Sequence, residues 1–500
     1  MGWINKMSDN IKKSLRSWLQ IQPGSPLNVH IQEFADFELS AIKNQIWYRG
    51  DGNELEQLYG QEPEYADKYK FWASRCSPGQ EIRKIHTGFP ALIVRTLCSV
   101  VLPDMNDFKF KSPAQQELWE DMAKENDFGH ALQEMLADVL VVGDGAWKVS
   151  IDTELSPYPI LEWYPGDRVE FVRRRGHIRE IIFKTPYQVA KQQYVLHEHY
   201  GYGYIKNHLY KGESEIDVNA LDATKGITDF AFDSSVILAV SVKIYNNAKY
   251  AGRGASIFDG KLDSFDALDE AWSQWMDAVR RARAKTYVDI SMVPRNEQTG
   301  SPLKLNPFDN SFFALQGGMS ESDNRDPINV VQPTIPHEGY TATYITALDL
   351  CLQGIISPST LGIDTKKLDN AEAQREKEKT TLYTRNAIVE TFQSFLPDVV
   401  GAAINAYHIL YGQPLEDVQV DVPFGEYANP SFESQVETVG KGRTQGIMSV
   451  EACVEELYGD TRDAKWKQEE VERLKAEQGI TELEEPALST TLGGFVVDEF

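Results

Sequence analysis

The chain has 500 residues, 42% of them hydrophobic, and a net charge of −25 at pH 7. This length allows roughly three structural units with large cores. The excess of 75 acidic over 50 basic residues argues against a surface that grips nucleic-acid phosphates widely, although DNA could still pass along it. Four widely spaced cysteines, Cys76, Cys98, Cys351 and Cys453, show neither zinc nor disulfide spacing and favour a reducing cytosol. The longest apolar stretch, 91–102, is interrupted by Arg95 and is too short to span a bilayer.

The first 30 residues contain the pattern of a basic amphipathic helix. Its apolar residues recur at three- and four-residue steps: Trp3, Ile4, Met7, Ile11, Leu15, Trp18 and Leu19. Its other faces carry Lys6, Lys12, Lys13 and Arg16. The pattern fits a helix on a membrane surface or an arm that docks on a neighbouring subunit. We favour the arm, because nothing else in this acidic chain favours an anionic membrane.

A helical region and then a region of strands follow the arm. Helical periodicity predicts helices at Gln32–Leu58, Tyr65–Arg75, Phe89–Val101 and Pro113–Val142. Short segments rich in β-branched and aromatic residues predict strands at Ala146–Ile151, Ile160–Tyr164, Val169–Arg174, Ile178–Thr185, Gln193–His199 and Tyr204–Tyr210. Together they predict an α+β, mainly helical fold with one antiparallel sheet attached to the helical body.

A long amphipathic helix is predicted at Leu262–Lys285. Its apolar stripe consists of Leu262, Phe265, Leu268, Trp272, Trp275, Met276 and Val279. Its first turns hold Asp263, Asp266, Asp269 and Glu270, and its last turns hold Arg280, Arg281, Arg283 and Lys285. This charge order complements the helix dipole at both ends, so we interpret the carboxylates as structural rather than as a two-metal nuclease site.

The rest of the chain alternates irregular and helical segments. Residues 287–337, rich in Pro, Gly and Asn, predict a small α/β module or an extended excursion, and a helix at Tyr340–Ile356 brings the chain back. A loop at Ser357–Asp369 precedes a long helix from Asn370 to about Leu410. We then predict a strand at Val418–Pro423 and helices at Ser431–Gly446 and Ser449–Tyr458. A charged, solvated helix at Lys465–Gln478 and a flexible tail follow.

Enzymatic signatures are missing from the sequence. It contains no phosphate loop, no nucleophile elbow and no H-E-x-x-H zinc motif. His197 and His199 flank Glu198 in a predicted strand and share one face, but without a third ligand nearby we interpret them as a solvated strand rather than a metal site. The turn at Gly143-Asp-Gly145 ends a helix, whereas phosphate-binding loops begin one. We therefore predict no catalytic residue, no cofactor and no metal.

The order of these elements resembles the portal proteins of long-tailed bacteriophages. Supporting stretches are Ile46-Trp-Tyr-Arg-Gly-Asp51 with Glu54 to Tyr59, Val141 to Val149, Gly254-Ala-Ser-Ile-Phe-Asp259, Asp369 to Lys379 with Thr384-Arg385, and Gly446-Ile-Met-Ser-Val450 with the helix Trp466 to Glu477. The resemblance covers most of residues 30 to 478. It departs after the strand Val418–Pro423, where many relatives carry an Asn-Arg pair and this chain reads Phe424-Gly-Glu-Tyr-Ala428.

The resemblance implies a closed, dodecameric ring with a central channel at one capsid vertex. Its parts would be an N-terminal arm (1–30), a wing (31–260), a first stem helix (261–286), a clip (287–337), a second stem helix (338–356), a tunnel loop (357–369), a wing spine helix with its return strand (370–423), a crown (424–478) and a C-terminal tail (479–500). Such a ring is assembled in the host cytoplasm and resides in the virion. It conducts DNA during packaging and ejection, and it docks the terminase large subunit and the head-tail adaptor.

The other implied partners are the major capsid and scaffolding proteins and non-specific double-stranded DNA, with no membrane. By resemblance the chain has no hydrolytic activity of its own, because the terminase supplies ATP hydrolysis. Lys366, Lys367 and Arg375 are the candidates to face DNA in the channel, although interleaved glutamates also fit an ordinary exposed helix start. A DNA-processing nuclease and a peripheral membrane or scaffold protein remain the alternatives.

Overall fold

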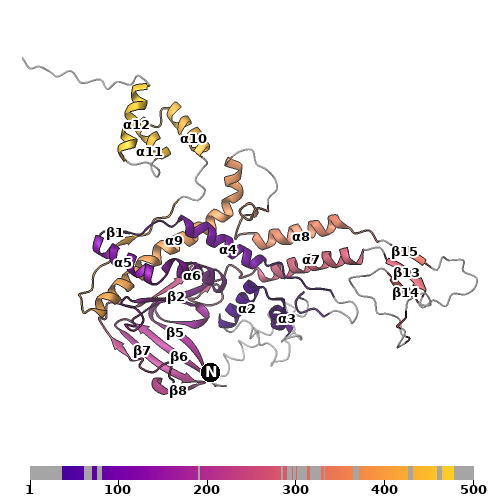
Figure 1. Cartoon of the computed structure of the whole chain (residues 1–500), viewed down its shortest axis with the longest axis horizontal. Helices are drawn as coiled ribbons and strands as arrows, with labels where there is room; N and C mark the ends of the chain where they lie inside the picture. Colours follow the sequence, from indigo (N-terminus) through magenta and orange to yellow (C-terminus); the bar gives the residue numbers. More distant parts are fainter. Residues whose placement is uncertain are drawn as a thin grey trace, which may run out of the picture. The chain divides into compact units, whose positions relative to one another are not determined.

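A computed structural model of the chain describes residues 37–60, 70–75, 82–189, 192–282, 285–289, 333–363, 371–425, 432–458 and 464–477, with short pieces at 295–296, 300, 312–315 and 328–331. The chain divides into two compact units. The first comprises Met1–Lys367 and Glu376–Gly425, and the second Leu368–Arg375 and Glu426–Phe500. The fold is α+β, and about half of the described residues are helical (Figure 1). The predicted arm and tail lie outside the described residues.

The first unit begins with short helices. They are α2 (Phe37–Arg49), α3 (Gly52–Gly60), α4 (Phe89–Val101), α5 (Pro113–Glu125) and α6 (Phe128–Val142), with the 3₁₀ turn η2 (Leu102–Asp104) after α4. The predicted helix 32–58 is divided at Gly50, whose φ of +70° is left-handed. The predicted helix 113–142 is likewise divided at Asp127, where φ is 46°. Only α4 has the predicted bounds.

The helix predicted at Tyr65–Arg75 is wrong over its described residues. Residues 65–69 lie outside the description, and residues 70–75 form a turn. The physical reason is a competing acceptor, because the amides of Phe71 and Trp72 donate to the carboxylate of Asp266, 2.8 and 3.3 Å away. A tertiary hydrogen bond thus replaces the helical ladder.

The predicted single sheet is wrong as well, because two larger antiparallel sheets form. One has the strand order β10-β2-β3, from β2 (Asp144–Ser150), β3 (Ile160–Pro165) and β10 (Ala239–Lys243). The other runs β4-β5-β6-β7-β8, from β4 (Val169–Arg174), β5 (His177–Val189), β6 (Gln192–Gly201), β7 (Tyr204–Lys211) and β8 (Ser214–Ile216), with β9 (Phe230–Ala231) also on β7. Besides η2, the described residues of this unit contain three 3₁₀ turns: η3 (Gly166–Arg168), η4 (Val218–Ala220) and η6 (Pro358–Leu361).

A buried lysine joins the two sheets. The ammonium of Lys148 on β2 lies 2.9 Å from Glu162 on β3 and 3.0 Å from Glu198 on β6. The neighbouring helix-to-strand turn is equally tight, since a Cβ at Gly143 would lie 2.6 Å from the carbonyl oxygen of Gly254. The body also contains two short two-stranded sheets. One pairs β1 (Lys109–Phe110) with β16 (Val420–Asp421), and the other pairs β11 (Tyr245–Asn246) with β12 (Gly254–Ala255). The predicted strand 418–423 is thus shorter than expected.

The main core lies between α4, α6, β2 and the long helix α9 (Ala371–Leu410). Ile388, Phe392, Leu396 and Val400 of α9 are all buried there. Residues Glu378–Leu410 are long and apolar enough to cross a membrane, and half of their apolar window is buried in the protein. This burial accounts for the hydrophobicity of α9 as that of a core helix.

Two further helices, α7 (Leu262–Arg281) and α8 (His337–Leu352), each have one end buried in the core. Between them a small mixed sheet of order β14-β13-β15 forms from β13 (Lys285–Asp289), β14 (Phe312–Leu315) and β15 (Ile328–Val331). β13 is parallel to β14 and antiparallel to β15. The predicted first helix therefore ends four residues early, because Lys285 begins β13, and the described residues of 287–336 contain strands and no helix.

The second unit contains α10 (Phe432–Thr444), α11 (Val450–Tyr458) and α12 (Ala464–Glu477). The last helix was predicted to be solvated, but one side of it packs on α11. The rings of Trp466 and Tyr458 are 5.1 Å apart, and Lys475 pairs with Glu451 at 2.6 Å. Trp466 therefore gives this charged helix an apolar contact that the dense charges obscured.

Candidate functional site

The helices α7 and α8 run side by side in opposite directions and form the candidate site (Figure 1). Three contacts fix the direction. Lys261, just before α7, donates to the carbonyl oxygen of Leu350 at 2.9 Å. Further along α7, the rings of Trp272 and Tyr344 are 5.5 Å apart and those of Trp275 and Tyr340 are stacked at 6.3 Å. Rising numbers on α7 meet falling numbers on α8, so the pair is an antiparallel hairpin that carries the small sheet.

The predicted stripe of α7 is buried at one end and exposed at the other. Phe265 and Leu268 are fully buried in the body core, and Leu262 packs against it. Trp272, Trp275 and Met276 are half-buried, and Val279 is 42% exposed. Beyond Ser273, whose hydroxyl accepts from the amide of Ile85 at 2.9 Å, the helix therefore leaves the body and is packed mainly on α8.

Asp269 holds a distant segment against the base of α7. Its side chain is fully buried and accepts from the indole of Trp72 at 3.1 Å and from the amide and hydroxyl of Thr87 at 2.9 and 2.8 Å. Nδ1 of His86 lies 2.7 Å from the same carboxylate. A buried carboxylate needs several donors to offset its lost hydration, and here residues 72–87 supply all of them.

Asp266 acts in the same way beside it. It accepts from the two amides of Phe71 and Trp72, and burial raises the pKa of this carboxyl to about 6, against the lowering effect of those hydrogen bonds. The helix-dipole explanation is therefore insufficient for Asp266 and Asp269, although it suits the exposed Asp263. A signal was present in the sequence, because Asp266 and Asp269 follow Leu262 and Phe265 by four residues and so lie within the apolar stripe.

The ring of His86 is enclosed. Its Nε2 is buried without a hydrogen-bond partner among the described residues, and a Cβ at Gly50 would lie 2.9 Å from that atom. Gly50 has a left-handed φ of +70°, so it supplies both the turn between α2 and α3 and the space for the ring. No sequence pattern predicted this contact, which joins α2, residue 86 and α7.

Two large apolar side chains of α8 are exposed within the single chain. Ile345 is 50% exposed and Leu350 is 49% exposed. On the other side of the helix, Ala347, Leu348 and Cys351 are buried. Large apolar side chains on both sides of a helix are typical of an element that is covered in an assembly.

The loop after α8 is fixed at its start to α9. The amide of Ser357 donates to the hydroxyl of Thr381 at 2.9 Å, and Thr360 and Thr381 share a 2.7 Å hydrogen bond. Lys366 and Lys367 lie outside the described residues. Arg375 belongs to the first turns of α9, and its side chain lies outside the description. Their proposed contact with DNA stays a prediction.

One histidine on β6 and one on β7 each lie beside a carboxylate. Nδ1 of His199 lies 2.9 Å from Glu180, and Nδ1 of His208 on β7 lies 2.7 Å from Glu215. Burial lowers the pKa of His197, and Lys184 and His199 add to that effect. Across the described part of the chain, no group of three His, Cys, Asp or Glu residues is arranged to hold a metal ion.

No family model matches the chain, and no curated protein matches it. Solved structures that the chain matches include the neck of a native GTA particle computed with C12 symmetry, at 12% identity and a TM-score of 0.38 over 77% of this chain and 91% of that one. A second is the neck of an empty GTA particle computed with C6 symmetry, at 12% identity and a TM-score of 0.35 over 73% and 88%. Both scores are below 0.5, so we base the proposed function on the chain's own residues.

Proposed function

We propose that the chain is the subunit of a closed ring, the portal of a tailed bacteriophage, through which DNA is packaged into the capsid and ejected from it. The observation that carries this proposal is the antiparallel hairpin of α7 and α8. In chain order the hairpin lies between the strands of the body and the long helix α9. A small sheet forms where its two helices are joined. This is the arrangement expected of a stem with a clip.

The exposed apolar residues of α8 support self-association. A monomer gains nothing from exposing Ile345 and Leu350 to water, whereas a neighbouring copy could bury both. Burying a leucine or isoleucine stabilises by about 2 kcal/mol, and a closed ring repeats that contact at every interface without leaving an open end. The exposed end of the α7 stripe at Val279 would be covered in the same way.

The charge of the chain suits a conduit for DNA. Roughly twelve subunits of −25 each would give a ring of about −300, which repels a polyanion over most of its surface. DNA could then slide without being held by many phosphate contacts. Lys366 and Lys367, in the loop between α8 and α9, would supply brief contacts to the backbone.

The proposal also assigns partners and location. The small sheet would dock the terminase large subunit and the head-tail adaptor, and the body would contact capsid and scaffolding proteins. The ring would assemble in the host cytoplasm and reside at one vertex of the virion. ATP hydrolysis would belong to the terminase, so we propose that this chain is not an enzyme.

The experiment that tests the proposal combines two substitutions on α8, Ile345→Asp and Leu350→Asp. Each places a charge where the ring needs an apolar contact, so light scattering should give a mass well below that of the unmodified assembly. Leu155→Asp is the matched control, because Leu155 is 75% exposed and lies away from the hairpin. Assemblies of unchanged mass in the α8 variant would contradict the proposed interface.

A further inference from the structure

A groove lies between β10, α9 and the segment that follows α9. Its volume is about 460 Å³, which is within the range of sites that bind ligands or peptide side chains. The apolar residues that line it include Val236, Val240, Pro397 and Val418. None of these residues belongs to the hairpin, so the groove is separate from the candidate site described above.

Three carboxylates line the same groove, at Asp398, Glu416 and Asp417. The loop that carries two of them is held in place by side chains. The amide of Glu416 donates to Asn405 at 3.2 Å, and its carboxylate accepts from Gln115 at 2.7 Å. A groove lined by both apolar and acidic side chains selects an occupant that is both apolar and basic.

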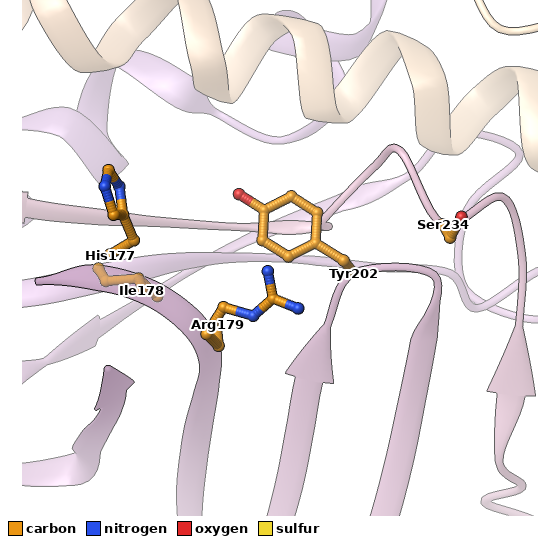
Figure 2. Close-up of a pocket in the computed structure, with 5 residues that line it drawn as sticks. All are labelled: His177, Ile178, Arg179, Tyr202 and Ser234. Atoms are coloured by element: carbon orange, nitrogen blue, oxygen red, sulfur yellow. The ribbon is translucent and has the colours of Figure 1, made fainter. Parts of the chain in front are cut away.

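A second pocket adjoins the groove and shares Ile178 and Tyr202 with it. Its volume is about 400 Å³. Figure 2 shows the ring of Tyr202 beside the guanidinium of Arg179, with His177 to the left of the ring and Ser234 to its right. The guanidinium lies 5.9 Å from the centre of that ring. An aromatic ring and an arginine side by side form a surface on which an indole can stack.

The N-terminal arm of this chain has the complementary chemistry. Its sequence places tryptophans and aliphatic residues on one helical face and Lys12, Lys13 and Arg16 on another. Its apolar stripe would contact the apolar residues of the groove, Trp18 would supply an indole to the adjoining pocket, and its cations would meet the three carboxylates.

We propose that this groove binds the N-terminal arm, residues 3–19, of a second copy of the chain. A second copy is favoured because subunits of −25 repel one another. A basic arm that crosses to an acidic groove offsets this repulsion at each interface. The inference rests on the proposed ring, to which it adds a link between neighbours that does not involve the hairpin.

The experiment forms cross-links in the full-length chain. Ser235→Cys places a thiol in the groove, and Ser8→Cys places one on the apolar stripe of the arm, four residues after Ile4. Ser17→Cys, four residues after Lys13, is the matched control on the polar face. Cys453 is partly exposed and Cys76 lies outside the described residues, so both are replaced by serine, while the buried Cys98 and Cys351 stay.

Under mild oxidation, Ser8→Cys with Ser235→Cys should form a ladder of covalent oligomers at least about tenfold faster than the Ser17→Cys pair, because docking raises the effective concentration of the two thiols. Adding Asp398→Lys and Asp417→Lys should slow the ladder by a similar factor. Glu154→Lys, on an exposed acidic residue away from the groove, should leave its rate unchanged.

Equal rates for Ser8→Cys and Ser17→Cys, or a ladder unaffected by the two lysines, would overturn the proposal. A cross-link only within one chain, seen as a faster-migrating monomer, would overturn the assignment to a second copy. Light scattering on the same samples separates this inference from the proposed function. Intact rings without the ladder would reject the arm contact alone, and a chain that stays monomeric would reject the ring.

Discussion

Asp269 is the residue on which the base of the hairpin most depends. Its buried carboxylate is bonded to Trp72 and Thr87 and lies beside His86. Removing one partner of such a network leaves the remaining donors without an acceptor, which costs more than the hydrogen bonds alone contributed. The attachment of residues 72–87 to α7 is therefore expected to be sensitive to substitutions at this position.

We predict that Asp269→Asn destabilises this attachment by about 2 kcal/mol. The amide of Thr87 donates directly to Asp269, so its hydrogen exchange should accelerate on the order of 30-fold if local opening controls it. Hydrogen–deuterium exchange of residues 82–88 measures this. Asp263→Asn is the control, since the Asp263 side chain is 83% exposed, and unchanged exchange in Asp269→Asn would contradict the assignment.

Asp266 gives a prediction for pH. Burial raises its folded-state pKa to about 6 from 3.8, so between these values the folded chain binds more protons than the unfolded chain. Stability contributed by this carboxyl is then present at low pH and is lost as the pH rises through about 6, by at most about 3 kcal/mol.

The corresponding measurement is the urea midpoint at pH 4.5 and pH 6.5, for the unmodified chain and for Asp266→Asn. The variant lacks the titrating group, so its midpoint should fall less over this interval. An identical fall in both chains would show that Asp266 does not titrate in this range.

Some contacts of single residues could not be predicted from the sequence. The periodicity of α7 predicted its stripe and placed Asp266 and Asp269 at its start. It could not show that both carboxylates would bind Phe71, Trp72 and Thr87, because those residues lie almost 200 positions earlier. The enclosure of His86 by Gly50 likewise depends on how three separate segments pack.

At the scale of elements, the hairpin depends on aromatic contacts between α7 and α8. Trp275 is stacked on Tyr340 and lies edge-on to Tyr344. Such pairs contribute about 0.5–1.5 kcal/mol beyond their buried area. These contacts hold the outer half of α7, where contact with the body has ended.

We predict a coupling of about 1 kcal/mol between Trp275 and Tyr340 in a double-mutant cycle of Trp275→Ala and Tyr340→Ala. Protection of the α8 amides from hydrogen exchange provides the measurement. A cycle between Gln274→Ala and Tyr340→Ala is the control, because Gln274 is exposed. Additive effects of Trp275→Ala and Tyr340→Ala would mean that the stacked pair contributes no specific stability.

Element bounds were predictable where the signal is local. Pro90 and the apolar run fixed α4, and turn residues at Pro165 and Gly176 separated the strands. The division into two sheets was not predictable, because it depends on β10 returning to pair with β2 from about 95 residues later. The early end of α7 has a similar cause, since Lys285 pairs in a sheet whose other strands lie far along the chain.

At the scale of the whole molecule, the acidic composition limits how the chain can meet DNA. Any contact must come from a few cations, of which Lys366 and Lys367 are the foremost candidates. We predict that replacing both with alanine impairs DNA packaging, and that the difference from the unmodified protein shrinks as salt is raised, because phosphate contacts weaken with salt. A packaging defect that does not change with salt would count against direct phosphate contact.

The central claim is that this chain closes into a ring. The most direct measurement is light scattering together with negative-stain electron microscopy of the purified full-length protein. The account predicts particles with a central hole at roughly twelve times the subunit mass of 56.5 kDa. A monodisperse monomer or dimer at all salt concentrations would contradict it and would favour the enzyme and membrane alternatives.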